Sequence, residues 1–114
     1  MRKYIFEIGK DVDVLRELIA KYITLVFLRT QGFEIIYPTL KNAKYLWTAL
    51  AATHIIAEKN GKRFAIAVKY GKAKLNQDEK STILSFKKAN CIPTFLQVNG
   101  DINKDRWQIG WKEL

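Results

Sequence analysis

Apolar residues recur every three or four positions along the first third of the chain, which is the spacing of one face of an α-helix. Asp11 or Asp13 can cap the start of this helix, because a carboxylate accepts hydrogen bonds from the free N–H groups of the first turn. Gly32 is expected to end it, since glycine readily adopts the left-handed conformation that follows many helices. The residues expected on the inward side of the helix are Leu15, Leu18, Ile19, Tyr22, Ile23 and Val26.

Short apolar runs bounded by turn residues predict strands in the rest of the chain. The clearest pair flanks Asn60-Gly61, the dipeptide that tight two-residue hairpins favour. Residues 2–8 are expected to form a short strand or an extended arm. The other predicted elements are helices over 42–52 and 77–89, the latter with Ile83, Leu84 and Phe86 inward, strands over 33–37, 53–58, 62–70, 94–98 and 106–111, and a turn through Asn99-Gly100-Asp101.

This order of elements predicts an α/β fold of three layers, in which helices flank a mixed central β-sheet. The sequence contains no repeat, low-complexity segment or linker, and 114 residues is an ordinary length for one domain. Residues 1–114 are therefore expected to form a single domain.

The charge balance indicates the partner. Twenty Lys and Arg against eleven Asp and Glu give a net charge of +9, and a field of that sign concentrates polyanions near the surface. Nucleic acid is the expected partner, with an acidic protein or membrane surface as the alternative.

Cysteine content and hydropathy indicate the compartment. The single cysteine, Cys91, cannot form an internal disulfide, which fits a reducing, cytoplasmic environment. The longest apolar run, residues 25–28, is far too short to span a bilayer, so no membrane insertion is expected.

The hairpin carries a family resemblance. It contains His54-Ile55-Ile56-Ala57, the Asn60-Gly61 turn, and Ala67-Val68-Lys69. This resembles the archaeal Holliday-junction resolvase family, whose members carry Asp-Ile-Ile-Ala, Asn-Gly and Glu-Val-Lys there. The resemblance implies a restriction-endonuclease-like fold, a homodimer, DNA as the partner, and an origin in an archaeon or one of its viruses.

The chain departs from the family at the acidic positions. The family's metal-binding Asp falls on His54, its Glu on Ala67, and its helix Glu on Leu15, whereas Lys69 is kept. Alanine and leucine offer no oxygen, and imidazole is a poor ligand for Mg²⁺. The sequence therefore predicts a catalytically degenerate nuclease domain with no metal, no cofactor and no family-type cleavage.

Basic residues near the motif predict phosphate contacts. With the acids gone, Lys69 is expected to lie in a groove free of carboxylates, where it would hold phosphate rather than assist turnover. Trp107 and Trp111 share one face of the last predicted strand and are expected at a dimer interface. The predicted nucleic-acid contacts are Lys41, Lys44, Lys62, Arg63, Lys69, Lys72 and Lys74.

Two other classes of function stay open. One is an active nuclease with an unconventional site. It would either be metal-free, cleaving RNA through His54 and Lys69 beside a tyrosine, or be rebuilt around relocated carboxylates. The other is a structural subunit that partners an active paralogue or a replication protein. The tyrosines considered are Tyr37, Tyr45 and Tyr70, and the carboxylates are Asp13, Glu17 and Glu58.

Overall fold

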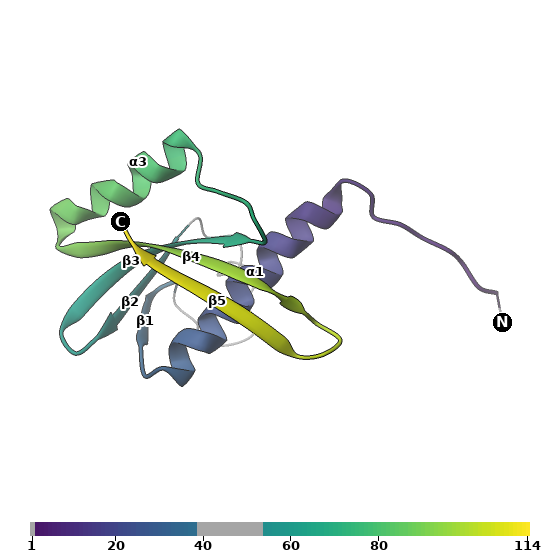
Figure 1. Cartoon of the computed structure of the whole chain (residues 1–114), viewed down its shortest axis with the longest axis horizontal. Coiled ribbons are helices and arrows are strands. Elements are labelled where there is room, and N and C mark those ends of the chain that lie inside the picture. Colours follow the sequence, from purple (N-terminus) through teal and green to yellow (C-terminus); the bar gives the residue numbers. More distant parts are fainter. Residues whose placement is uncertain (1, 39–53) are drawn as a thin grey trace.

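The computed structural model describes residues 2–38 and 54–114, and within them five strands form one mixed sheet in the order β1-β2-β3-β4-β5 (Figure 1). Neighbouring strands are antiparallel except β3 and β4, which are parallel. The crossover that joins these two strands contains α3. The elements are α1 (Asp11–Thr30), β1 (Glu34–Tyr37), β2 (Ile55–Lys59), β3 (Lys62–Tyr70), α3 (Gln77–Ser85), the 3₁₀ segment η2 (Phe86–Ala89), β4 (Cys91–Asp101) and β5 (Arg106–Glu113).

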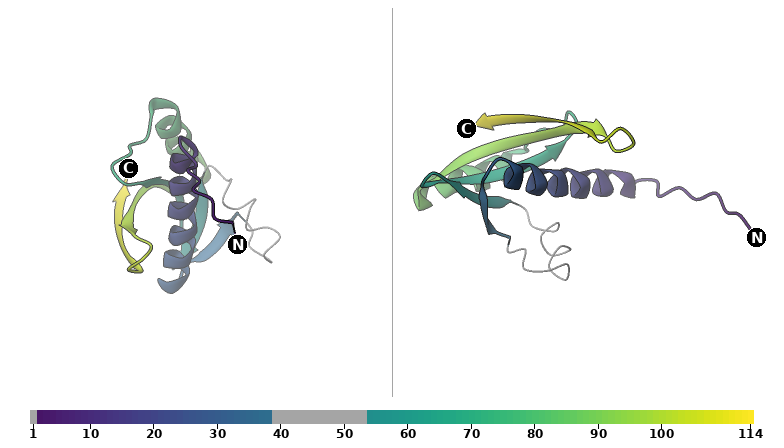
Figure 2. Two further views of the ribbon diagram at one scale, coloured as in Figure 1. Left: turned by 90° about the vertical axis from the view of Figure 1, so that its right-hand side faces the viewer. Right: turned by 90° about the horizontal axis from the view of Figure 1, so that it is seen from below.

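Among the described residues, the α-helices α1 and α3 lie on opposite faces of the sheet, which confirms the predicted α/β fold with a mixed sheet flanked by helices. Alternation along β3 divides the core between them. Phe64, Ile66 and Val68 belong to the cluster under α1, whereas Ala65 and Ala67 belong to the cluster under α3. Figure 2 shows α1 lying along one face of the sheet. Lys69 continues the alanine series and therefore points toward the α3 side.

The β2–β3 hairpin forms as predicted. Asn60 and Gly61 have φ angles of 54° and 76°, the pair of positive values that a tight hairpin turn requires. The turn brings Lys59 opposite Lys62 and sets the register of the whole pair. A local dipeptide thus fixes where the motif residues of β3 lie relative to β2.

The start of α1 differs from the prediction. Residues 2–8 form an extended arm without strand pairing, which is one of the two forms expected for them. The difference is the N-cap, which is Lys10, and its side chain makes no capping bond. Asp11 and Asp13 lie inside the first turn, where carboxylates interact favourably with the helix dipole without capping. Gly32 follows the helix end with φ of 85°, as its predicted role requires.

The last two strands are longer than predicted. Residues 99–101 do not form a turn, because Asn99 pairs with Gln108 and Gly100 with Trp107. The pairing requires glycine at position 100, because the Cβ of any other residue would overlap the Trp107 ring. The turn instead spans 102–105, after the last pair of the β4–β5 ladder.

The buried side of α1 is not the predicted one. Ala20, Leu25 and Leu28 are buried against the sheet, together with Thr24, whose hydroxyl donates to the Ala20 carbonyl. The predicted inward stripe, which begins at Leu15, is half-buried or exposed. The helix carries apolar residues on more than one side, so periodicity alone selected the wrong face.

The helix predicted over 42–52 lies outside the described residues. The predicted helix over 77–89 is present, with its last turn tightened to the 3₁₀ form and ended by Asn90 in the left-handed conformation. No helix within 2–38 or 54–114 is both long enough and apolar enough to cross a membrane.

Candidate nucleic-acid interface

A pocket of about 520 Å³ lies beside the first turn of α3 and brings together three of the four motif positions. His54, Ala67 and Lys69 line it. The fourth, Leu15, lines a different groove on the far side of α1, so Leu15 does not occupy the position expected for the family's helix glutamate. Glu17, two residues further along the helix, lines the motif pocket instead.

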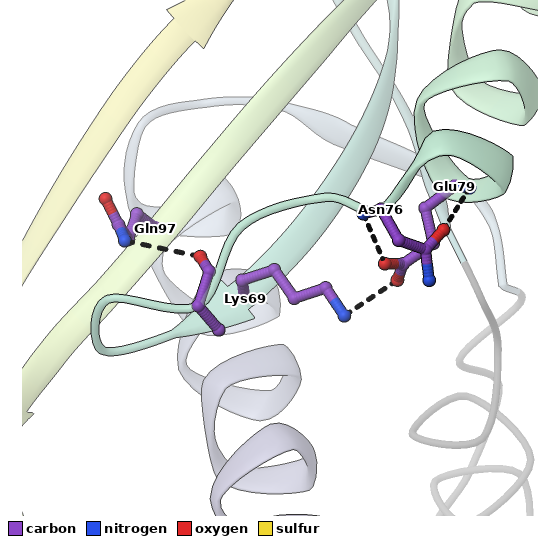
Figure 3. Close-up of polar contacts among 5 residues, drawn as sticks. Lys69, Asn76, Glu79 and Gln97 are labelled. Carbon is purple, nitrogen blue, oxygen red and sulfur yellow. Dashed lines mark hydrogen bonds and ion pairs between the residues drawn. The ribbon is translucent and has the colours of Figure 1, made fainter.

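The pocket is not free of carboxylates, which corrects the environment predicted for Lys69. Glu17, Asp78 and Glu79 line it. The Lys69 ammonium lies 2.7 Å from a carboxylate oxygen of Glu79, and only 20% of the lysine side chain is exposed (Figure 3). Lys69, which was expected to contact phosphate, is therefore neutralised by Glu79 of the same chain.

Glu79 is held in place by the start of α3. The Asn76 side chain accepts a hydrogen bond from the Glu79 backbone N–H, and the Glu79 carboxylate accepts one from the Asn76 N–H, forming a capping box (Figure 3). Burial alone would raise the pKa of Glu79, but the Asn76 N–H bond and the Lys69 ammonium outweigh it and lower the pKa. Glu79 is thus a fixed anion.

Lys21 adds a second ammonium to the pocket from α1. Burial lowers its pKa, Glu17 on the preceding helical turn opposes that shift, and Lys69 adds to it. Two lysines and three carboxylates therefore share one pocket, and their formal charges sum to −1. Such a pocket has little excess attraction for phosphate.

His54 lies between two aromatic rings at the edge of the same pocket. Its ring centroid is 5.2 Å from that of Tyr37 and 4.7 Å from that of Phe86. Partial burial lowers the pKa of His54 and favours the neutral imidazole. Tyr70, by contrast, bonds through its hydroxyl to the Gly100 carbonyl and packs with the cluster under α1.

Of the two described tyrosines considered beside His54, Tyr37 packs against it and Tyr70 does not. Tyr45 falls outside the described residues, as do the predicted contacts Lys41 and Lys44. In the part of the chain that the structure describes, no three His, Cys, Asp or Glu side chains are grouped to hold a metal ion.

The loop that carries Lys72 and Lys74 is tied down at both ends. Gln97 of β4 donates from its side-chain amide to the carbonyls of Gly71 and Ala73 (Figure 3 shows one bond from Gln97). At the other end the capping box begins at Asn76. Both lysines are exposed, so the loop presents cations on a fixed backbone.

A second groove, of about 500 Å³, lies on the other side of α3. Lys74, Lys80 and Lys112 line it, and all three are exposed. None of the described residues that line it is Asp or Glu. Phe95 and Gln97 form part of its floor on β4. We refer to it as the lysine groove.

The predicted basic residues do not form one patch. Lys62 and Arg63 line a hollow at the start of β3, roughly 23 Å of strand away from Lys69. Arg63 donates to the Glu58 carboxylate at 2.8 Å, so this arginine is already paired. Glu58, considered for a rebuilt metal site, faces that hollow and not the motif pocket.

Trp107 and Trp111 share one face of β5, as predicted, but have different surroundings. Trp111 packs on Phe33 and Phe64, with ring centroids 5.8 and 5.4 Å away. Trp107 donates from Nε1 to the Asp105 carboxylate and borders a groove beside α1. Trp111 combines these ring contacts with an exposed fraction of 36%, whereas Trp107 is half-buried and packs against the core cluster under α1.

Sequence reasoning missed Lys21, Glu79, Lys80 and Lys112. The spacing Asn76-x-x-Glu79 is a capping-box pattern and was the one local signal that placed Glu79 at the start of a helix. The other three are ordinary surface lysines in sequence, and only the packing of α1, α3 and β5 gives them a common setting.

Comparison with known proteins gave no matching family model and no matching curated protein.

Proposed function

We propose that this chain binds nucleic acid, DNA foremost, through phosphate contacts, and does not cleave it. The observation that carries the proposal is the lysine groove, where Lys74, Lys80 and Lys112 meet without a carboxylate side chain among the described lining residues. Three ammonium groups at one groove would neutralise about three phosphates of a bound strand.

The anchored loop supports this proposal. A cation on a flexible loop loses conformational freedom when it binds, and that loss weakens affinity. Gln97 and the Asn76 cap already hold the backbone on either side of Lys74. Part of the ordering cost of binding is therefore met during folding.

The resemblance to archaeal Holliday-junction resolvases supports DNA, duplex or branched, as the polyanion. The environment of Lys69 supports binding without cleavage, because its ammonium is paired with Glu79 and Ala67 brings no carboxylate to the pocket. We therefore assign the main phosphate contacts to the lysine groove, with Lys72 contributing from the loop that carries Lys74, rather than to the motif lysine.

The proposal can be tested by fluorescence anisotropy with a labelled four-way junction, its matching linear duplex and a single-stranded RNA. Each titration is run in Mg²⁺ and in EDTA over a salt series. The variant Lys74→Gln/Lys80→Gln/Lys112→Gln is compared with Lys87→Gln/Lys88→Gln/Lys104→Gln, which removes the same charge from exposed sites elsewhere.

We expect the groove variant to lose more than tenfold in affinity at low salt. Its log–log salt slope should become shallower by about 2.7, since each phosphate contact contributes about 0.9. The control variant should keep most of its slope. Equal losses in the two variants would overturn the groove assignment. No binding by the wild type at moderate salt would overturn nucleic-acid binding and favour the structural-subunit alternative.

A second candidate, metal-free RNA cleavage, is favoured by one observation: His54 and Lys69 line the same pocket, with Tyr37 packed on His54. The EDTA arm of the same experiment tests it. RNA products in EDTA that disappear in His54→Ala and Lys69→Ala would establish this activity, whereas nicks only in Mg²⁺ would point to relocated carboxylates.

A further inference from the structure

An apolar groove lies between the outer side of α1 and β5. It consists of two adjoining hollows of about 440 and 220 Å³, which share Ile23, Asp105 and Trp107. Tyr22 and Val26 of the outer stripe remain 47% and 42% exposed. We refer to it as the α1 groove; its apolar lining residues are Leu15, Leu18, Ile19, Tyr22, Ile23, Val26, Phe27, Ile102, Trp107 and Ile109.

The N-terminal arm, residues 2–8, contains an exposed apolar segment of the same chain. Tyr4, Ile5 and Phe6 are 81%, 99% and 84% exposed. Apolar side chains with that exposure have a large free-energy gain available on burial. The part of the chain that the structure describes thus presents both an apolar groove and an exposed apolar peptide.

The arm is directed away from the groove of its own chain. It leaves the start of α1 and extends beyond the body of the molecule (Figures 1 and 2). Backbone N–H groups of the first helical turn donate to the carbonyls of Ile8, Gly9 and Lys10, which holds these three residues at the start of the helix. The arm can therefore reach a second molecule with this turn unchanged.

The dimensions of arm and groove match. Seven extended residues span roughly 20 Å, and the groove runs along α1 from Leu15 to Val26, roughly 17 Å of helix. Tyr4 and Phe6 each offer about 150–250 Å² of surface to bury. The four rings of two arms thus bury about 600–1,000 Å². The groove surfaces that they cover bury a similar area, so the total reaches the ~1,200–2,000 Å² typical of a specific interface.

The charges also match. Asp105 lies at the junction of the two hollows and is exposed, and it is the one charged residue among those described that line the groove. The arm begins with Arg2 and Lys3, directly before its apolar residues. An arm seated in the groove can place a cation beside Asp105 while its aromatic rings cover Tyr22 and Trp107.

We propose that two copies of this chain form a homodimer by exchanging their N-terminal arms, each arm lying in the α1 groove of the other copy. Exchange is reciprocal, so the interface closes with two-fold symmetry and both grooves are filled. The proposal is independent of nucleic-acid binding, because the lysine groove contains no residue of the arm or of α1.

Sedimentation velocity of the full chain over a concentration series provides the test. We expect the wild type to be dimeric, and both Ile5→Asp/Phe6→Asp in the arm and Leu15→Glu/Tyr22→Glu in the groove to be monomeric, with at least a hundredfold weaker association. Val14→Ser is the control, because Val14 is an exposed apolar residue of α1 that does not line the groove. Far-ultraviolet circular dichroism checks that every variant is folded.

Mixing the two monomeric variants distinguishes exchange from any other dimer. The mixture retains one intact arm and one intact groove on different chains, so a heterodimer should form that neither variant gives alone. A wild type that stays monomeric at 100 µM and above, dimers that survive the arm substitutions, or a mixture that stays monomeric would each overturn the proposal.

Discussion

The ammonium of Lys69 and the carboxylate of Glu79 form an ion pair at 2.7 Å, between the end of β3 and the first turn of α3. Lys69 is the one residue of the nuclease-like motif that the chain retains, whereas Glu79 is not part of that motif. It lowers the capacity of Lys69 to hold phosphate, and it fastens α3 to the sheet beside the motif pocket.

Replacing Glu79 should release Lys69 for phosphate. Glu79→Gln keeps an oxygen for the capping box but removes the charge that pairs with the lysine. We expect tighter DNA binding and a salt slope steeper by about 0.9, as one further phosphate contact gives. Anisotropy titrations measure both. Glu34→Gln, which removes an exposed acid from β1, is the control, and equal effects of the two substitutions would refute this role of the pair.

Stability should fall in acid through Glu79. Its folded-state pKa is lowered below the ordinary value of 4.5, so the unfolded chain binds the proton more tightly. The stabilisation is therefore complete above about pH 4.5 and is lost as pH falls through the folded-state pKa. Urea unfolding between pH 3 and 6 should show a smaller pH dependence for Glu79→Gln than for the wild type; identical curves would contradict the assignment.

The single histidine reports on the motif pocket. Burial lowers the pKa of His54 below 6.5, so its imidazole is neutral at pH 7. Because the folded-state pKa is the lower one, this group stabilises the fold fully above pH 6.5 and loses that effect as pH falls through the folded-state value. An NMR titration of its ring protons should give a midpoint below 6.5. A midpoint at or above 6.5 would show that the aromatic packing around His54 is wrong.

The two apolar sides of α1 should respond differently to truncation. Leu28 is fully buried against the sheet, so Leu28→Ala should cost about 2–5 kcal/mol of unfolding free energy. Leu15 is 45% exposed, so Leu15→Ala should cost less than about 1 kcal/mol at concentrations where the chain is monomeric. Chemical denaturation measures both. A larger loss of unfolding free energy at Leu15 than at Leu28 would show that the side of the helix predicted from periodicity is the buried one.

The sequence by itself determined the elements that depend on neighbouring residues, such as the hairpin turn and the end of the first helix. Asn60-Gly61 required a tight turn, and that turn sets the β2–β3 register from Lys59↔Lys62 onward. Gly32 ended the first helix because the chain there needs a positive φ. Alternation placed Ala67 and Lys69 on one face of β3, and the order of strands and helices gave the α/β class.

Only the tertiary structure decided which side of α1 faces the sheet, because the helix is apolar on more than one side and either could be buried. It also decided what surrounds Lys69: Glu79 lies ten residues away along the chain and reaches the lysine only because α3 crosses back over β3. The same holds for Lys74, Lys80 and Lys112, which a loop, a helix and an edge strand bring to one groove. Local spacing specifies elements, whereas contacts between side chains on different elements depend on how those elements pack.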